Sequence, residues 1–334
     1  MTTSILPLGD SELEARLLPL LTEVEHRLRD AVVGADRLVD APAAHLAAAG
    51  GKRLRPLLTL LTAELGGGSN EQVLRAAVAV ELTHLATLYH DDVMDSAPMR
   101  RGAPAAHEVW GNSVAILTGD LLFARASQLV ASLGPQAVLV HAETFERLCL
   151  GQLHETLGPA EGEEPVGHYL QVLADKTGSL IAASARYGAS FSGAPDEVAE
   201  ILARYGEKVG VAFQLADDVI DLSADAATTG KTPGTDLREG VDTMPVLLLR
   251  RRAAAGALDE QGVAVLRRLG ADLRSDDALR SVVADLRNHE VVDEARELAA
   301  TWAADAVAEL DPLPAGEIKD ALGAFAGILV DRMA

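Results

Sequence analysis

The stretch Glu81-Leu-Thr-His-Leu-Ala-Thr-Leu-Tyr-His-Asp-Asp-Val-Met-Asp95 decides how the rest of this chain is interpreted. No Gly or Pro interrupts the sequence from Ser69 to Ala97, and apolar residues recur at helical spacing. The pattern therefore predicts one long helix that ends near Pro98. One face of that helix would carry polar residues at positions i, i+3, i+7 and i+11, which are His84, Thr87, Asp91 and Asp95.

Three carboxylates, those of Asp91, Asp92 and Asp95, would lie within about a turn and a half of this helix. Like charges this close repel one another and make a poor core. They would suit a hard cation, because Mg²⁺ prefers oxygen ligands and usually shares one or two carboxylates with substrate phosphates. A solvated acidic helix end is the simpler alternative, and a single copy of the spacing does not decide between the two.

The same spacing occurs again in Phe213-Gln-Leu-Ala-Asp-Asp-Val-Ile-Asp221, after another long apolar helical stretch. On this second helix, Gln214, Asp221 and either Asp217 or Asp218 share a face. Two chance copies would be roughly a one-in-a-hundred event. The repeat therefore favours a metal-dependent site that uses two acidic helices.

The composition limits the partners of the protein. The chain has 29 Lys and Arg against 50 Asp and Glu, whereas nucleic acids and anionic membrane surfaces attract basic proteins. The single Cys149 excludes an intrachain disulfide and favours a reducing compartment. The first residues lack the features of a signal peptide, and no uncharged apolar run approaches ~18 residues. We therefore expect a cytoplasmic protein with no nucleic-acid partner and no integral membrane segment.

Helical patterns fill the remainder of the chain, with no period-2 strand and no composition shift typical of a linker. The expected fold class is all-α: one large helical bundle, forming a single domain over residues 1–334. Further helices are expected at residues 12–29, 42–49, 57–65, 107–110, 112–133, 136–157 and 195–222, from 169 onward with an interruption at 175–180, and as four or five segments after 244.

Basic residues gather at four further places. They follow two glycines in Gly50-Gly-Lys-Arg-Leu-Arg-Pro56, and they follow the first acidic motif at Arg100-Arg101. They also stand at the helix interruption, in Lys176-Thr177, and in a loop, in Gly230-Lys231. Each group could be ordinary surface charge. Cations of this kind are also what a diphosphate site would use.

Taken together and in this order, the motifs resemble those of the trans-isoprenyl diphosphate synthases, from about His45 to Pro245. The resemblance implies a bundle with a deep cavity, the two acidic helices facing each other across its mouth, and a homodimer. It also implies a Mg²⁺-dependent, head-to-tail condensation of isopentenyl diphosphate onto an allylic diphosphate. No separate protein base stands out, and the released diphosphate is the family's usual proton acceptor.

The same resemblance assigns roles to individual residues. The Mg²⁺ ions that bridge the allylic diphosphate would be bound by Asp91, Asp92, Asp95 and Asp217, with Asp218 and Asp221 nearby. Direct cationic contacts to that diphosphate would come from Arg100, Lys176 and Lys231, while Thr177 and Gln214 would lie near the nascent allylic cation. Isopentenyl diphosphate would be held by Lys52, Arg55, His84 and Arg101. Such preorganised charge stabilises the departing group.

One departure from the family pattern concerns a diphosphate contact. Many relatives carry Lys after the Asp-x-x-x-Gly element, where this chain has Val241. Its loss could weaken binding of the allylic substrate, and Lys231 and Arg238 are candidates to replace the contact.

The length of the product depends on what the growing chain meets beside the first acidic helix. One helical turn is about 5.4 Å, close to one isoprene unit, so the first residues met would be Ala86 and Thr87, with Thr83 a turn further on. Short-chain relatives place Phe or Tyr at such positions, and the small residues here predict a long-chain product, heptaprenyl to decaprenyl. Such a product would serve as a quinone side chain, for example that of menaquinone. The alternative is that these residues simply pack in the core. Deeper residues would then close the end of the cavity, and the product would be short-chain.

Two functions of other classes would leave different marks in the sequence. A class I terpene cyclase would usually replace the second acidic motif with an Asn/Asp–Ser/Thr–Glu pattern and would not need Lys52 and Arg55. A non-catalytic subunit of a heteromeric synthase would tend to lose the acidic motifs, and this chain keeps both.

Overall fold

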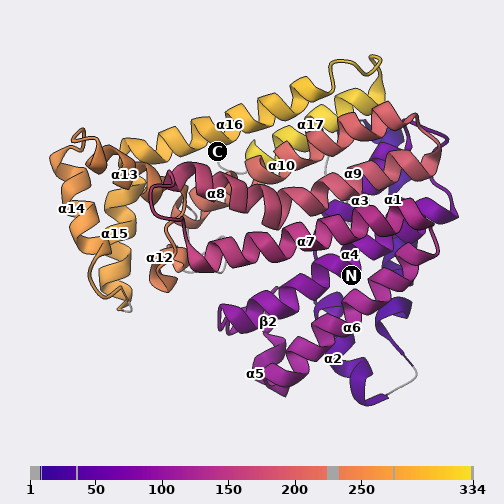
Figure 1. The fold of residues 1–334 in the computed structure, drawn as a ribbon, viewed down its shortest axis with the longest axis horizontal. Helices are drawn as coiled ribbons and strands as arrows, with labels where there is room; N and C mark the ends of the chain where they lie inside the picture. The colour runs from indigo at the N-terminus through magenta and orange to yellow at the C-terminus, as the bar shows by residue number, and fades with distance from the viewer. Residues whose placement is uncertain (1–7, 9, 35–36, 224–232, 274, 332–334) are drawn as a thin grey trace. The chain divides into compact units, whose positions relative to one another are not determined.

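The computed structural model describes residues 8, 10–34, 37–223, 233–273 and 275–331. Within these ranges the protein is all-α except for one hairpin of two-residue strands, so the predicted fold class is confirmed (Figure 1). The elements of the first half are α1 (Ser11–Val32), α2 (Arg37–Ala48), α3 (Leu54–Ala63), α4 (Glu71–Met94), β1 (Met99–Arg100), β2 (Ala103–Pro104), α5 (Ala106–Trp110), α6 (Asn112–Ala131) and α7 (Pro135–Leu157). Those of the second half are α8 (Pro165–Leu173), the π-helix η1 (Ala174–Gly178), α9 (Ser179–Ser192), α10 (Asp196–Ser223), α12 (Thr235–Glu239), α13 (Met244–Ala254), α14 (Glu260–Leu269), α15 (Asp276–Arg287), α16 (Glu290–Glu309) and α17 (Glu317–Asp331).

The chain divides into two compact units, which are described separately. Unit 1 comprises Met1–Leu148, Ser179–Glu207 and Glu309–Phe325, and unit 2 comprises Cys149–Gly178, Lys208–Ala308 and Ala326–Ala334. The first acidic motif belongs to unit 1 and the second belongs to unit 2. The single domain expected over residues 1–334 stays a prediction.

Helix α4 is the central helix of unit 1. The side chain of Asn70 caps it by accepting from the N–H groups of Gln72 and Val73. No Gly or Pro weakens the helix, its buried residues lie on several sides, and it packs against α3, α6 and α9. It ends at Met94, one turn before the predicted end, because Asp95 already caps it and Ser96 has a positive φ of 51°.

A hairpin follows α4 where the sequence predicted only a loop. Met99 pairs with Pro104 and Arg100 with Ala103, so the two strands are joined by Arg101 and Gly102. Both joining residues have positive φ, 53° and 76° respectively, as a tight type I′ hairpin turn requires. A strand of two residues shows no period-2 pattern, which explains why the sequence did not reveal it.

Helix α2 begins earlier than predicted. The sequence suggested a start at Pro42, but the helix begins at Arg37 and contains that proline. The hydroxyl of Tyr89 on α4 donates to the carbonyl oxygen of Pro42 and accepts from the N–H of Leu46 at 3.3 Å. This buried hydroxyl binds both backbone groups and ties α2 to α4.

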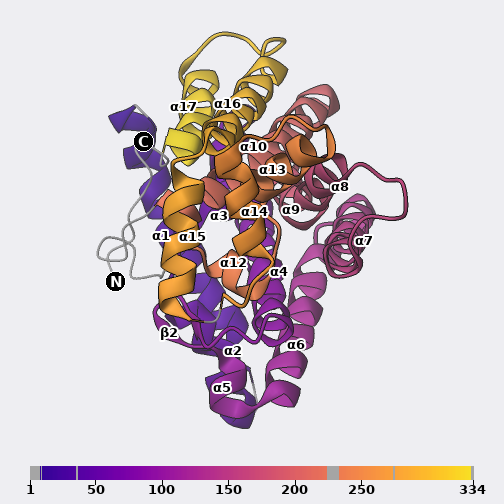
Figure 2. The ribbon, with the colours of Figure 1, turned by 90° about the vertical axis from the view of Figure 1, so that its left-hand side faces the viewer.

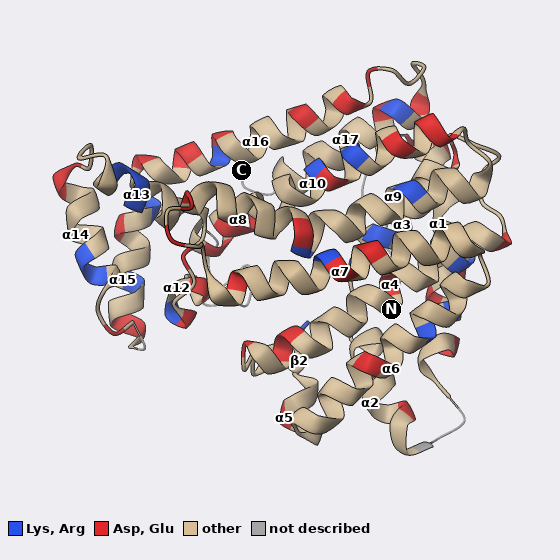
Figure 3. Cartoon of the chain, in the orientation of Figure 1, with Lys and Arg blue, Asp and Glu red and all other residues tan. Residues whose placement is uncertain are grey.

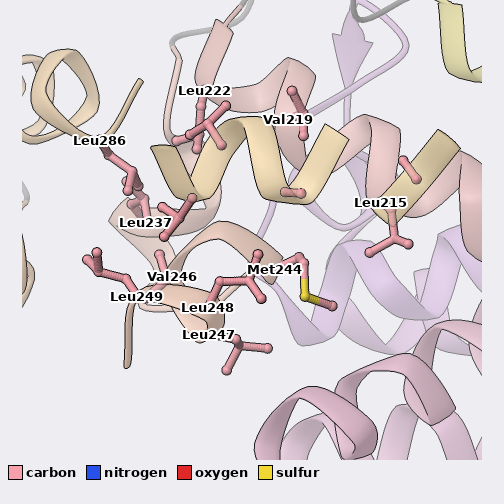
Figure 4. Close-up of a cluster of buried hydrophobic side chains, with 14 of the residues drawn as sticks. Leu215, Val219, Leu222, Leu237, Met244, Val246, Leu247, Leu248, Leu249 and Leu286 are labelled. Atoms are coloured by element: carbon pink, nitrogen blue, oxygen red, sulfur yellow. The ribbon is translucent and has the colours of Figure 1, made fainter. Parts of the chain in front are cut away.

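Unit 2 has a hydrophobic core of its own. Leu215, Val219 and Leu222 of α10 pack with Leu286 of α15 and with five residues of α13: Met244, Val246, Leu247, Leu248 and Leu249 (Figure 4). Helices α14 and α15 lie side by side at the edge of this core (Figure 2). The five helices from α13 to α17 agree with the four or five segments predicted after residue 244.

Helix α6 is the one helix of the described ranges that is long and apolar enough to cross a membrane by length and composition. It packs lengthwise along α4 and contributes Leu122, Ala126 and Val130 to the buried residues of unit 1. It also contains Asp120 and Arg125. Helix α6 is therefore a core helix of the bundle.

Candidate active site

Asp92 is the most buried carboxylate of the first acidic motif. Its side chain is 0% exposed, and Nε of Arg100 donates to its Oδ1 at 2.5 Å. Its Oδ2 is buried without a hydrogen-bond partner. Burial raises the pKa of Asp92, and the charge and hydrogen bond of Arg100 oppose that shift. An orphaned buried carboxylate oxygen is costly, and a bound cation would satisfy it.

Asp91 and Asp95 lie on the more accessible side of the same helix end. Asp91 is half-buried and Asp95 is exposed, and the N–H of Asp95 donates to the carbonyl oxygen of Asp91 at 2.8 Å. Across the described ranges, no three acidic, His or Cys side chains converge into a ready-made metal site. Mg²⁺ usually binds to one or two carboxylates together with waters and substrate phosphates. The carboxylates of this motif therefore fit a divalent cation that takes its remaining ligands from a diphosphate.

The basic turn before α3 is anchored by a buried ion-pair network. Arg53 is 4% exposed, lies in the left-handed region with φ of 49°, and donates to Glu25, to Glu81 at 2.7 Å and to the carbonyl oxygen of Ala47 at 3.1 Å. Glu81 itself is 1% exposed on α4. Arg53 is thus committed to the protein, while its neighbour Lys52 is exposed.

Arg101 packs against the two glycines of the same turn, Gly50 and Gly51. Its Nη1 donates to the carbonyl oxygens of Gly50 and, at 3.3 Å, of Leu46. A Cβ atom at Gly51 would lie 2.9 Å from this guanidinium, and Gly51 has φ of 149°. Glycine is needed there because the arginine lies against the backbone. Burial lowers the pKa of Arg101.

Arg55 and His84 lie in the same basic region of unit 1. Nε of Arg55 is buried without a hydrogen-bond partner, and burial lowers the pKa of this guanidinium to about 10 although Glu81 opposes the shift. Burial, followed by the charges of Arg55 and Arg101, also holds the pKa of His84 well below its ordinary value. The imidazole of His84 is therefore neutral and can offer a hydrogen bond among cations. Arg55, His84 and Arg101 lie close enough for the two arginine charges to act on His84, and their role in binding an anion stays a prediction.

The residues expected to control product length differ in burial. Ala86 and Thr83 are fully buried, and the hydroxyl of Thr83 donates to the carbonyl oxygen of Ala79 at 2.8 Å. Thr87 is half-buried and donates to the carbonyl oxygen of His84 at 2.8 Å. Helix α6 approaches closely here, since a Cβ at Gly119 would lie 3.1 Å from the carbonyl oxygen of Ala86. Their role in setting product length stays a prediction.

In unit 2, the predicted helix interruption takes the form of the π-turn η1. It contains Lys176 and Thr177, and π-turns of this kind are frequent at functional sites. Lys176 is half-buried and its Nζ lies 2.5 Å from Oε2 of Glu155 on α7. Thr177 is 8% exposed. Glu155 was not identified from the sequence, because no motif marks it.

The carboxylates of the second acidic motif have different surroundings. Asp217 and Asp221 are half-buried, as is Gln214, whereas Asp218 is 5% exposed. Asp218 accepts from the hydroxyl of Tyr169 and from the N–H of Met244. Burial raises its pKa well above the ordinary range, and these two hydrogen bonds oppose the shift.

The loop after α10 is described only in part. Lys231, expected to contact the diphosphate, lies outside the described residues. Arg238, considered as a replacement for the missing family lysine, has its Nη2 2.5 Å from Oδ1 of Asp276. Val241 is 38% exposed.

Acidic side chains are spread along many helices, including α16, so charge alone does not mark the site (Figure 3). Sequence reasoning missed three residues that hold its predicted groups in place: Glu81, Glu155 and Tyr169. Arg53 was considered with the cations of the basic motif, as either surface charge or a diphosphate contact, but the structure pairs it with Glu25 and Glu81.

Comparison with known proteins supports the same class of protein. Residues 36–286 match the polyprenyl synthetase family model. The nonaprenyl diphosphate synthase of Mycobacterium tuberculosis is 45% identical over 326 residues, which cover 97% of this chain and 96% of that protein. The dimethylallyltranstransferase of the same organism is 39% identical over 318 residues, or 94% of each chain. The crystal structure of geranylgeranyl pyrophosphate synthase from Corynebacterium glutamicum, complexed with calcium and isoprenyl diphosphate, has 41% identity and a TM-score of 0.85, and covers 97% of this chain and 98% of that one.

The chain belongs to the polyprenyl synthetase family. It is a prenyltransferase, a trans-prenyl diphosphate synthase, and it has the fold of the isoprenyl diphosphate synthases. The family uses divalent metals and implies isoprenyl diphosphates as substrates. The resemblance found in the motifs is therefore confirmed, and the terpene-cyclase alternative is set aside.

Proposed function

We propose that this protein is a Mg²⁺-dependent, all-trans polyprenyl diphosphate synthase that makes a long-chain product from isopentenyl diphosphate and a farnesyl or geranylgeranyl primer. The observation that carries the proposal is the arrangement in unit 1. A basic region with Arg55, neutral His84 and Arg101 belongs to the same unit as an acidic helix end with an orphaned oxygen on Asp92. The reaction requires cationic side chains that bind one diphosphate and carboxylates that bind the metal ions of the other diphosphate.

In this proposal the two sets of residues have separate tasks. Lys52, Arg55 and Arg101 bind isopentenyl diphosphate, and His84 orients it through a hydrogen bond. Divalent cations held by Asp91, Asp92, Asp95 and Asp217 stabilise the charge of the departing allylic diphosphate. Arg100 and Lys176 then exchange their carboxylate partners, Asp92 and Glu155, for diphosphate oxygens.

The long-chain product is the finer part of the proposal. It is supported by the small side chains of Thr83, Ala86 and Thr87 beside the acidic motif and by 45% identity to a nonaprenyl synthase. The 41% identity to a geranylgeranyl synthase favours a short-chain product as the second candidate. A long polyprenyl product would serve as a quinone side chain, such as that of menaquinone, made in the cytoplasm.

We also propose that the protein is a homodimer. Its support is the apolar outer side of α6 and α7, where Ile116, Leu117, Val138 and Leu139 are 41%, 66%, 44% and 50% exposed. The two helices contact each other, since the rings of Phe123 and Phe145 lie 4.4 Å apart. Exposed apolar side chains that form a patch are typical of an interface, and a second copy would cover those on α6 and α7.

Product analysis tests the proposal. Purified protein is incubated with Mg²⁺, isopentenyl diphosphate and, in separate reactions, dimethylallyl, geranyl, farnesyl or geranylgeranyl diphosphate, and the products are identified by mass spectrometry. A ladder that ends between heptaprenyl and decaprenyl is expected. A stop at farnesyl or geranylgeranyl would select the short-chain candidate. No product without an added partner chain would mean that the protein acts as a subunit of a heteromeric enzyme.

A further inference from the structure

Tyr169 and Asp218 form a buried hydrogen-bonded pair in unit 2. The Tyr169 hydroxyl lies 2.9 Å from Oδ2 and 3.1 Å from Oδ1 of Asp218, and the N–H of Met244 donates to Oδ2 at 3.1 Å. The carboxylate is therefore bound from α8, which carries Tyr169, and from the first residue of α13. At 5% exposure, Asp218 has little open surface left for a substrate.

A second contact sets the register of the same two segments. A Cβ atom at Gly210 of α10 would lie 2.5 Å from Cα and 2.9 Å from N of Gly178, the last residue of η1. Only glycine permits so close an approach. Tyr169 thus contacts Asp218, and Gly178 contacts Gly210. Because the later residue of one segment contacts the earlier residue of the other, the segment α8–η1 runs antiparallel to α10.

Lys176 and Thr177 lie between these two contacts. The segment from Tyr169 to Gly178 is one residue longer than the segment from Gly210 to Asp218 that it accompanies. The π-turn η1, an i→i+5 distortion, lies within this segment and contains both Lys176 and Thr177. The placement of Lys176 and Thr177 therefore depends on both contacts being held.

Helix α7 supports the π-turn from its own side. A Cβ at Gly151 would lie 2.8 Å from the backbone N of Lys176 and 3.1 Å from Cβ of Asp175. One turn further along α7, Glu155 pairs with the ammonium group of Lys176. The backbone and the side chain of Lys176 are both fixed by elements of unit 2.

Asp217 and Asp218 point in different directions. Neighbouring residues on a helix are about 100° apart, and Asp218 is 5% exposed and is bound by Tyr169 and by the N–H of Met244. Asp217 is half-buried and so faces a more open side. The motif has two adjacent carboxylates, but their surroundings suit them to different tasks.

We propose that Tyr169 and Asp218 are positioning residues, which lock α8–η1 on α10 and thereby fix Lys176 and Thr177 relative to Asp217. Asp218 then acts through its hydrogen bonds and does not itself touch metal or diphosphate. This inference rests on the proposed function, because it takes Lys176 as a diphosphate-binding group and Asp217 as a ligand of the divalent cation. The resemblance to the family had placed Asp218 with the substrate.

The variants Tyr169→Phe, Asp218→Asn, Asp218→Ala and Asp217→Asn separate the two roles. An Asn at position 218 keeps an oxygen that accepts from Tyr169 and Met244 but removes the charge. The matched control is Tyr187→Phe, because Tyr187 is another buried tyrosine, whose hydroxyl donates to the carbonyl oxygen of Ala137 at 2.9 Å in unit 1. Calorimetry with inorganic pyrophosphate and Mg²⁺ measures binding independently of turnover.

The expected result is a split between neighbouring positions. Asp218→Asn should stay within about threefold of the wild-type affinity, whereas Asp217→Asn, Tyr169→Phe and Asp218→Ala should each weaken Mg–pyrophosphate binding by about tenfold. Combining Tyr169→Phe with Asp218→Ala should add little to either alone, because both remove one interaction. The KM for the allylic substrate should rise in parallel, while the KM for isopentenyl diphosphate stays within about twofold.

Two results would overturn the inference. One is an Asp218→Asn variant that binds as poorly as Asp217→Asn, since the charge would then be needed. The other is a Tyr169→Phe variant that behaves as Tyr187→Phe does. Failure of the proposed function looks different: the wild type would bind Mg–pyrophosphate with this pattern of variants but extend no allylic diphosphate. A wild type that does not bind pyrophosphate would refute both.

Discussion

Arg53 and Glu81 form a buried ion pair in which Nη1 of the guanidinium lies 2.7 Å from Oε1 of the carboxylate. Their side chains are 3% and 2% exposed, and Arg53 also pairs with Glu25. The pair joins the basic turn before α3 to α4, three residues before His84. It therefore links the chain that carries Lys52 and Arg55 to the helix that carries the first acidic motif.

Replacing Glu81 with Gln should destabilise the protein strongly. Arg53 would remain charged and buried with one carboxylate fewer, and breaking a buried pair typically costs roughly 3 kcal/mol in unfolding free energy. Urea denaturation would measure the loss. The matched control is Glu71→Gln, which weakens the solvent-accessible pairs with Arg27 and Arg75 and should cost below about 1 kcal/mol. Equal losses in the two variants would contradict a structural role for the buried pair.

The all-α class, most helices and the candidate role of the acidic motifs could be predicted from the sequence, because each depends on the order and spacing of residues within a short segment. The long helix around Asp91 needs only helical periodicity and the absence of Gly and Pro. The interruption near Lys176 was also indicated by its Gly and Thr neighbours, although not its π form.

What the sequence could not supply are contacts between distant segments. Nothing local marks Glu81 as the partner of Arg53, or Tyr169 as the donor to Asp218 forty-nine residues away. The start of α2 was misplaced for a related reason. A proline usually marks a first turn, but Tyr89 of α4 binds the backbone around Pro42 within the helix.

Replacing Thr87 or Ala86 with Phe should shorten the product sharply. A bulky ring at either position would stand about one helical turn before Asp91, where the growing chain is expected to pass. Thr87→Phe is the safer variant, because Thr87 is half-buried, whereas overpacking at the fully buried Ala86 should cost about 1–3 kcal/mol. Mass spectrometry of the products provides the measurement. Ala124→Phe, at an exposed site on α6, is the control. An unchanged product length in both α4 variants would refute the hypothesis that the small residues of α4 permit a long product.

His84 should make the stability of the protein depend on pH in the acidic range. Burial and the charges of Arg55, Arg101, Arg53 and Arg100 hold its pKa well below the ordinary value of 6.5. Below pH 6.5 the imidazole of His84 binds a proton in the unfolded chain but stays neutral in the folded protein, so protons favour unfolding. The stabilisation that is present above pH 6.5 is therefore lost as the pH falls through the lower pKa of the folded protein. The unfolding free energies of wild type and His84→Gln should therefore converge as the pH is lowered from 8 to about 5.5. If the unfolding free energies of the two proteins kept a constant difference across this pH range, His84 would not titrate in this way.

Leu117 should hold two copies of the protein together. It is 66% exposed on α6 although the helix is apolar enough to resemble a membrane span. Light scattering coupled to size exclusion should give about twice the chain mass of 35.0 kDa for the wild type and the single-chain mass for Leu117→Asp. The burial of a charged group without a partner in the interface would cause the dissociation. Val263→Asp, at a 44% exposed apolar residue of α14, is the control and should leave the mass unchanged. A monomeric wild type, or a Leu117→Asp variant that stays dimeric, would place the interface elsewhere or remove it.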